Sequence, residues 1–261
     1  MLACLLPLSS ARAQGSVFDD AVWDLGAGLG GFRYHLYPGS ADEDSFVIPT
    51  PYLTYRSPLL EIDRGVRGFF YSSEDIVLDI SADFSLPVDS SDSAARAGMA
   101  DLNAVLQVGP SIEFLLGDED HDVRLELPLR MALATDLADT DNLGWVFEPR
   151  LSIEHRRSTP TGASWKATGG LTYSASDYHA YYYDVSASDV TAQRSEYRSD
   201  GGYSGAFISL RGTYRFDDWI AWVYLRVHTL SGSTIEDSPL VERDSYRLVG
   251  VGLSWIFASS D

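Results

Sequence analysis

Apolar and polar side chains alternate along three segments in the last third of the chain, residues 206–216, 219–230 and 245–257. In the last segment one parity holds Val249, Val251, Leu253, Trp255 and Phe257, and the other is mostly small, with Gly250, Gly252 and Ser254. A period of two with one apolar side is the pattern of a β-strand whose faces meet different surroundings. Each segment has about ten residues or more, which suits a tilted strand that crosses a bilayer.

The connections between these segments are unequal in length. Asp217 and Asp218 alone join the first segment to the second, whereas residues 231–244 join the second to the third. Short turns on one side and long loops on the other are typical of outer-membrane barrels. We therefore expect a periplasmic turn at Asp217–Asp218 and extracellular loops at residues 177–204 and 231–244.

The same alternation predicts eight further strands earlier in the chain, for a total of eleven. They lie at residues 22–37, 46–56, 59–72, 75–84, 102–116, 123–133, 145–155 and 165–175. Bacterial single-chain barrels have an even number of strands, so the predicted fold is all-β, a transmembrane antiparallel up-and-down β-barrel of about 12 strands. The missing strand is expected at residues 179–186 or within the N-terminal third. No segment shows a sustained helical period.

The pattern at the N-terminus indicates the end of a secretory signal peptide. Residues 1–13 are short and apolar and close on Ala11-Arg12-Ala13, which predicts a signal peptide remnant followed by a single barrel domain at residues 14–261. The alternative is an apolar tail. Removal of the signal removes Cys4, the only cysteine, and no later run of eighteen apolar residues predicts a membrane helix. The expected location is the outer membrane of a Gram-negative cell.

The chain is acidic, with 38 Asp and Glu against 19 Lys and Arg and a formal net charge of −19. This balance disfavours nucleic acid as a partner. Much of the acid lies between the predicted strands, as at residues 42–44, 118–120 and 236–237. Solvated turns explain this placement. The alternative is that divalent cations bridge these acidic loops to lipopolysaccharide. Outer-membrane lipid and lipopolysaccharide are the expected surroundings.

Catalytic and metal-binding patterns are not apparent in the sequence. The five histidines, at positions 35, 121, 155, 179 and 228, are scattered without metal-ligand spacing. The run from Gly202 to Gly205 lacks the final glycine of a nucleophile elbow. We therefore predict neither an enzyme nor a cofactor.

Charged residues of both signs occupy the polar parity of the predicted strands. These predicted lumen-facing residues are Asp79, Asp83, Arg124, Glu126, Arg130, Glu148, Arg150, Glu154, Lys166, Arg211 and Arg215. Ion pairs between neighbouring strands would brace a filled interior, and the alternative is a narrow watery path biased toward cations. Trp145, Trp165, Trp219 and Trp255 lie at or near strand ends, where indole rings favour the bilayer interface.

A set of short motifs in a fixed order is similar to the MltA-interacting protein (MipA)/OmpV family. The motifs are Tyr-Pro-Gly-Ser at 37–40, Pro-Tyr-Leu-Thr-Tyr-Arg at 51–56, Val-Gly-Pro at 108–110, Leu-Pro-Leu-Arg at 127–130, Leu-Ser-Gly at 230–232, Asp-Ser-Pro-Leu-Val at 237–241, Asp-Ser-Tyr at 244–246 and Trp-Ile-Phe at 255–257. The resemblance implies a signal peptide, an outer-membrane β-barrel, no enzymatic activity and no residue-level site. The chain departs from the usual terminal aromatic of barrels, because four residues follow Phe257.

Three functional hypotheses follow. The resemblance implies a scaffold that associates with a periplasmic murein transglycosylase and a murein synthase. The polar interior also allows a small porin-like channel for ions or solutes. A soluble secreted β-sandwich is the third, and it would place Leu125, Leu127 and Leu129 in a dry middle between two sheets.

Overall fold

The computed structural model describes residues 22–56, 60–62, 66–73, 75–117, 122–136, 138–156, 159 and 161–260. The predicted signal remnant at residues 1–13 lies outside this part of the chain. The strands are β1 (Val22–His35), β2 (Glu43–Arg56), β3 (Leu60–Ile62), β4 (Val66–Ser72), β5 (Ile76–Ser85), β6 (Ala104–Leu115), β7 (Asp122–Thr135), β8 (Thr140–Phe147), β9 (Arg150–His155), β10 (Gly162–Ser174), β11 (Gly202–Phe216), β12 (Trp219–Thr229) and β13 (Ser245–Ser259). The helices are η1 (Ser90–Asp92) and α1 (Ser176–Tyr183).

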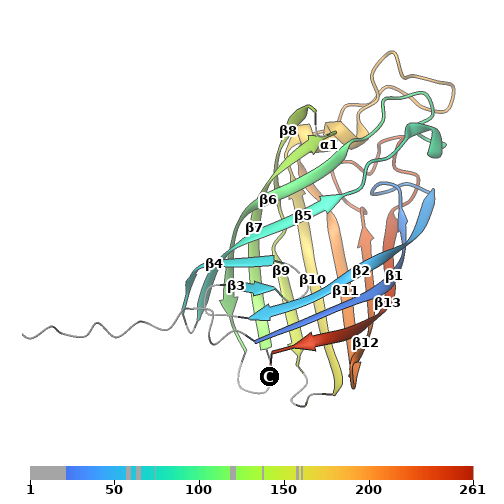
Figure 1. Cartoon of the computed structure of the whole chain (residues 1–261). Coiled ribbons are helices and arrows are strands. Elements are labelled where there is room, and N and C mark those ends of the chain that lie inside the picture. Colours follow the sequence, from blue (N-terminus) through green and yellow to red (C-terminus); the bar gives the residue numbers. More distant parts are fainter. Residues whose placement is uncertain are drawn as a thin grey trace, which may run out of the picture.

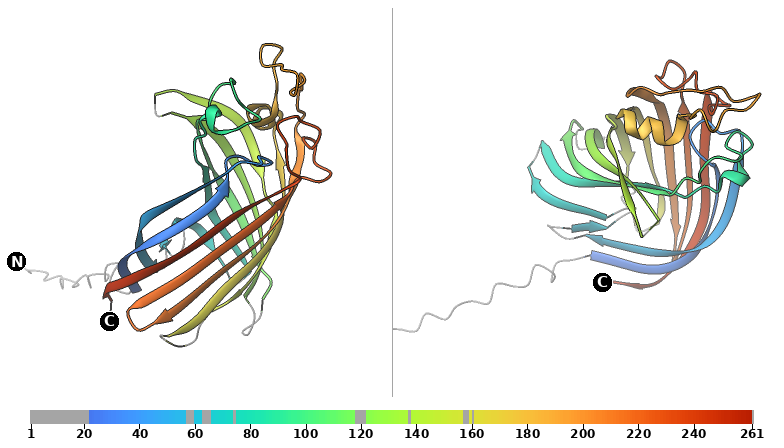
Figure 2. Two further views of the ribbon diagram at one scale, coloured as in Figure 1. Left: turned by 90° about the vertical axis from the view of Figure 1, so that its right-hand side faces the viewer. Right: turned by 90° about the horizontal axis from the view of Figure 1, so that it is seen from above.

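The strands form one antiparallel sheet that closes on itself (Figures 1 and 2). Apart from β8 and β9, each described strand pairs with its neighbours along the chain, and β1 pairs with β13 from Asp24–Ser259 to Tyr34–Leu248. Closure leaves no free outer edge at the two ends of the sheet, which is how a barrel satisfies its backbone hydrogen bonds in lipid. The predicted antiparallel β-barrel is confirmed.

The described strands occupy twelve positions around the ring, because β8 and β9 share one. Both pair with β7 on one side and with β10 on the other, and they are separated by Glu148 and Pro149. The strand predicted at residues 59–72 is divided into β3 and β4, so the missing crossing lies in the N-terminal third. The alternative position at residues 179–186 is wrong, since α1 and the start of a loop occupy it.

The two faces of each strand differ in exposure as the alternation predicts. On β7, Glu126 is 0% and Arg130 is 2% exposed, whereas Leu129 between them is 48% exposed. A soluble sandwich would bury the leucine and expose the charges, so that hypothesis is wrong. The exposed apolar side chains form the outer surface, which suits contact with hydrocarbon.

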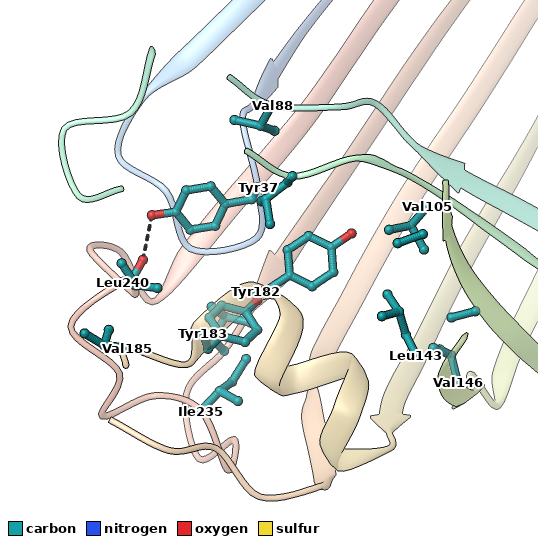
Figure 3. Packing of buried hydrophobic residues seen from close by; sticks show 14 residues of the cluster. Tyr37, Val88, Val105, Leu143, Val146, Tyr182, Tyr183, Val185, Ile235 and Leu240 are labelled. Carbon is teal, nitrogen blue, oxygen red and sulfur yellow. Dashed lines mark hydrogen bonds between the residues drawn. The ribbon is translucent and has the colours of Figure 1, made fainter. Parts of the chain in front are cut away.

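A cap lies over the end of the barrel that carries the long loops. We define it as α1 together with the loops at residues 36–42, 86–103, 184–201 and 230–244. Its buried core joins Tyr182, Tyr183 and Val185 to Tyr37, Val88, Leu102, Leu230, Ile235 and Leu240 from the other loops (Figure 3). The upper, inward residues of β6, β7 and β8, such as Val105, Ala134 and Val146, complete this core from below.

Candidate functional site in the capped lumen

The inner wall of the barrel carries a network of buried ion pairs centred on Glu126 of β7. This carboxylate accepts hydrogen bonds from Arg150 Nε at 2.7 Å, from Lys166 Nζ at 2.8 Å and from Ser152 Oγ at 3.1 Å. The donors come from β9 and β10, so one side chain links three strand positions. Such a fully bonded carboxylate stabilises the wall, whereas an unpaired buried charge would destabilise it.

A second carboxylate, Glu148, lies at the break between β8 and β9. It accepts from Arg150 Nη1 at 3.1 Å and from Arg226 Nη2 at 2.8 Å, and Arg130 Nη2 lies 3.7 Å away. Arg226 belongs to β12, and β10 and β11 separate this strand from β8 and β9. The Glu148–Arg226 pair therefore joins two strand positions that are not neighbours in the sheet. The Arg226 guanidinium also lies 3.7 Å above the centre of the Phe207 ring.

Arg130 extends this network toward β5 and β6. Its guanidinium donates to Gln107 Oε1 at 3.1 Å and to Ser81 Oγ at 3.2 Å, and it lies 3.9 Å from Asp83. Nearer the opposite end of β7, Arg124 pairs with Asp122 at 2.7 Å and with Glu113 at 3.2 Å.

The other predicted charged residues lie along the same inner surface. Asp79 is buried on β5. Glu154 pairs with Arg156 at 3.2 Å, and Arg215 pairs with Asp24 of β1 at 2.8 Å. The Arg211 guanidinium lies 5.7 Å from the centre of the Tyr224 ring.

The prediction omitted several residues that take part in this network, and four of them are Asp24, Gln107, Glu113 and Arg226. Each alternates with apolar neighbours, as Glu113 does between Ile112 and Phe114 and Arg226 does between Leu225 and Val227. The same parity rule that selected the other residues would therefore have included them.

A cavity of about 1860 Å³ occupies the part of the lumen that these side chains leave open. Its lining begins at Asp24, Arg215 and Ser260 near the short-turn end and reaches Tyr183 and Ile235 beneath the cap. The cavity thus runs along most of the barrel and ends at the cap's buried core.

Two arginines join the segments of the cap to one another. Arg96 donates to the carbonyl of Tyr182 at 2.9 Å and lies over the Tyr37 ring at 5.7 Å. Arg194 donates to the carbonyl of Ala95 at 2.6 Å and so joins the loop after α1 to the loop between β5 and β6. Burial raises the pKa of Tyr37 to about 12, and its hydroxyl donates to the carbonyl of Leu240 at 2.9 Å.

His179 lies inside the cap, on α1. Its Nδ1 is 2.7 Å from the carbonyl oxygen of Asp200, and its Nε2 is 2.7 Å from the hydroxyl of Ser204. The ring therefore donates from Nδ1 and accepts at Nε2 when it is neutral. Burial lowers the pKa of His179, which favours this neutral form.

The four predicted interface tryptophans are all partly exposed on the outer surface. Trp219 and Trp255 are opposite each other on β12 and β13, and Trp165 stacks on His155 with ring centres 6.1 Å apart. Trp145 lies near the cap, at the other end of the barrel, since the carbonyl of Trp145 accepts from the N–H of Ala175 just before α1.

Among the residues that the structure describes, no group of histidine, cysteine or carboxylate side chains has the arrangement of a metal site. No helix within the described ranges is long and apolar enough to span a membrane.

Comparisons with known proteins agree with this architecture. Residues 25–257 match the family model described as MltA-interacting protein MipA. The chain is 32% identical over 88 residues to outer membrane protein Omp26La of Vibrio anguillarum and to outer membrane protein OmpV of Vibrio cholerae serotype O1. Each of these matches covers 34% of this chain and 34% of the relative, so the chain spans about a third of the length of the curated relatives it matches.

Two solved structures are similar to the chain at low sequence identity. The NanC porin has a TM-score of 0.40 at 10% identity, over 88% of this chain and 98% of the porin. A FadL homologue of Pseudomonas aeruginosa has a TM-score of 0.35 at 8% identity, over 92% and 91% of the two chains. The family model covers nearly all of the described barrel, and the chain belongs to the MltA-interacting protein MipA family of outer-membrane β-barrels.

Proposed function

We propose that this protein is a non-enzymatic scaffold of the outer membrane that docks a periplasmic murein transglycosylase. The observation that carries the proposal is the cap, whose buried core packs α1 and the long loops over one end of the barrel and so opposes straight passage through it. The ion-pair network holds the wall in one shape, which suits a rigid anchor. The family description supplies the class of partner.

The periplasmic end of the barrel is the surface that such a partner would reach. The turn between β11 and β12 presents two adjacent carboxylates, Asp217 and Asp218, and both are exposed. A matching partner surface would be basic, because charge complementarity speeds and orients docking.

Crosslinking in the native host tests the scaffold directly. We expect a lytic transglycosylase to co-purify with the wild-type barrel after crosslinking, and we expect the Asp217→Asn/Asp218→Asn variant to recover several-fold less. Asparagine tolerates the positive φ of 49° at Asp217, so the turn is retained. Asp237→Asn, an exposed change on the cap, is the matched control. No transglycosylase from any of the three proteins would refute the scaffold, and equal recovery from all three would refute docking at the Asp217–Asp218 turn.

A small channel is the second candidate, and the cavity of about 1860 Å³ favours it. A path biased toward cations would follow from the acidic residues of the wall. Planar-bilayer recording with purified protein separates the two functions. The scaffold predicts no steady conductance above background while the cap is folded, whereas a stable conductance with cation preference would support the channel.

A further inference from the structure

The barrel wall is incomplete between β2 and β5, and this gap lies in its extracellular half. Only Tyr55 and Arg56 of β2 pair with β3, and β4 pairs with β5 only as far as Asp79. The described residues of β3 and β4 pair with each other from Leu60–Gly68 to Ile62–Val66, and they lie toward the periplasmic end of the gap (Figure 1). Within the described residues, positions 43–51 of β2 and 80–85 of β5 have no strand partner on the sides that face each other.

The gap has a frame on all four sides and is therefore a window in the wall. Above it, the N–H of Ala94 donates to Asp42 at 2.9 Å and Arg96 lies over Tyr37, which joins the two neighbouring loops. Below it lies the β3–β4 hairpin. Ile48 and Leu53 on one margin and Phe84 and Leu86 on the other line the same cavity, so the window opens into the lumen.

The margins of the window are apolar on the side that faces the membrane. Val47 and Phe84 are each 72% exposed, the highest values among the large apolar side chains. Because the long loops are extracellular, the window lies at the depth of the outer leaflet. Unpaired backbone groups are costly in hydrocarbon, so water from the lumen or a bound ligand has to satisfy them at this place.

An apolar surface leads from the window into the lumen, although the opposite wall is charged. The ring centres of Phe46 on β2 and Phe32 on β1 are 5.3 Å apart, and those of Phe32 and Trp222 on β12 are 5.5 Å apart. We call Phe46, Phe32 and Trp222 the aromatic track. These rings cross β13, where the intervening positions, Gly250 and Gly252, have no side chain.

Glycines make this surface possible by letting the rings lie flat against the wall. A methyl group at Gly252 would lie 2.4 Å from the Trp222 indole, and one at Gly30 would lie 2.8 Å from it. A methyl group at Gly250 would lie 2.9 Å from the Phe32 ring. The rings therefore line the cavity without filling it, and the space above them stays open to a ligand.

A strand from a second copy is the obvious alternative occupant of an unpaired edge. Pro49 and Pro51 lie on the edge of β2 that borders the window. Proline has no N–H to donate and is found on edge strands because it opposes further pairing. The window therefore fits a small molecule better than an added strand.

We propose that the window and the aromatic track admit and bind uncharged hydrophobic small molecules that have dissolved in the outer leaflet. The cavity of about 1860 Å³ exceeds the usual volume of a small-molecule pocket, roughly 300–1,000 Å³, so such a ligand fits with water beside it. The charged wall opposite disfavours apolar contact and confines the ligand to the track. This inference goes beyond the scaffold and does not depend on it.

Photolabelling of the full barrel in lipid nanodiscs tests the site. The probe is 3-trifluoromethyl-3-phenyldiazirine, an uncharged aromatic compound, and labelled peptides are mapped by mass spectrometry. We expect label at Phe32, Phe46 and Trp222 that saturates and that excess naphthalene displaces, and label at Leu129 that does not saturate. Label confined to outward residues at every probe concentration would overturn the proposal.

Matched variants test the route. Ile48 lies at the window on the lumen side, and Ile48→Asp places a charge there, so we expect saturable labelling of the track to fall at least about tenfold. Ser209→Asp adds the same charge on β11, away from the window, and we expect a change of less than about twofold. Heat-modifiable electrophoretic mobility establishes that both variants fold. Track labelling that survives Ile48→Asp, or crosslinks between β2 edges of two copies, would overturn the lateral route.

Discussion

Replacement of Glu126 by glutamine tests whether the lumen wall is braced by its charges. Glu126 is fully buried and accepts from Arg150, Lys166 and Ser152 at 2.7–3.1 Å. Glutamine keeps the shape but removes the charge, so Lys166 loses its counterion. Breaking a buried pair in this way costs about 3–5 kcal/mol when the remaining charge has no other partner.

The expected loss of unfolding free energy lies at or below the low end of this range, because Arg150 and Lys166 keep some contact with water and with other partners. The Arg150 and Lys166 side chains are 23% and 18% exposed, and Arg150 still pairs with Glu148 at 3.1 Å. We therefore expect Glu126→Gln to lower the free energy of unfolding by about 2–3 kcal/mol. Lys166→Met in the same chain removes the stranded charge and should restore part of the loss.

Urea unfolding in phospholipid vesicles, followed by circular dichroism, measures this change as a shift of midpoint at constant slope. Arg33→Gln is the control, since the Arg33 side chain is 63% exposed in its pair with Glu43 and its removal should cost about 0–1 kcal/mol. A loss for Glu126→Gln no larger than that of the control would mean that water, and not the network, solvates the wall.

Three further changes probe the lipid face and the cap. Leu129→Arg should lower the free energy of unfolding in vesicles by about 2–4 kcal/mol because it places a charge in hydrocarbon, and an unchanged midpoint would contradict a lipid-facing position. Arg194→Ala removes a donor to three carbonyls in two loops, so amide hydrogen exchange should speed up in the cap and not in the barrel strands. Equal exchange rates in the wild type and the variant would refute this role of Arg194. Burial lowers the pKa of His179, so the unfolded cap takes up a proton first and cap stability should fall as pH drops below about 6.5. Hydrogen exchange at pH 7.5 and 5.5 should show this loosening in the wild type and not in His179→Gln.

The sequence predicts the barrel well because strict alternation of apolar and polar side chains leaves only one choice of the face that each strand turns toward lipid. The leucines of β7 and the charges between them, such as Glu126 and Arg130, fix which face meets lipid. Parity does not tell which charges pair, because this depends on register. Glu126 pairs with Arg150 only because the chain breaks at Glu148 and Pro149 and resumes beside β7 as β9.

The cap and the window could not be predicted from periodicity. The α1 sequence, Ser-Asp-Tyr-His-Ala-Tyr-Tyr-Tyr, has no apolar stripe, and contacts from other loops hold the helix in place. Arg96 and Ser238 bond to the carbonyls of Tyr182 and Tyr183, and both donors are distant in sequence. The division into β3 and β4 could not be predicted either, because a short hairpin and one long strand show the same alternation of apolar and polar residues.

The Glu148–Arg226 pair has a consequence for the order of assembly. Its two halves lie on strand positions that become neighbours across the lumen only after β10, β11 and β12 have joined the sheet. A barrel that stalls before β12 is inserted holds Glu148 without the Arg226 counterion. A barrel without β12 is therefore penalised electrostatically relative to the complete one, so the pair favours closure of the full sheet.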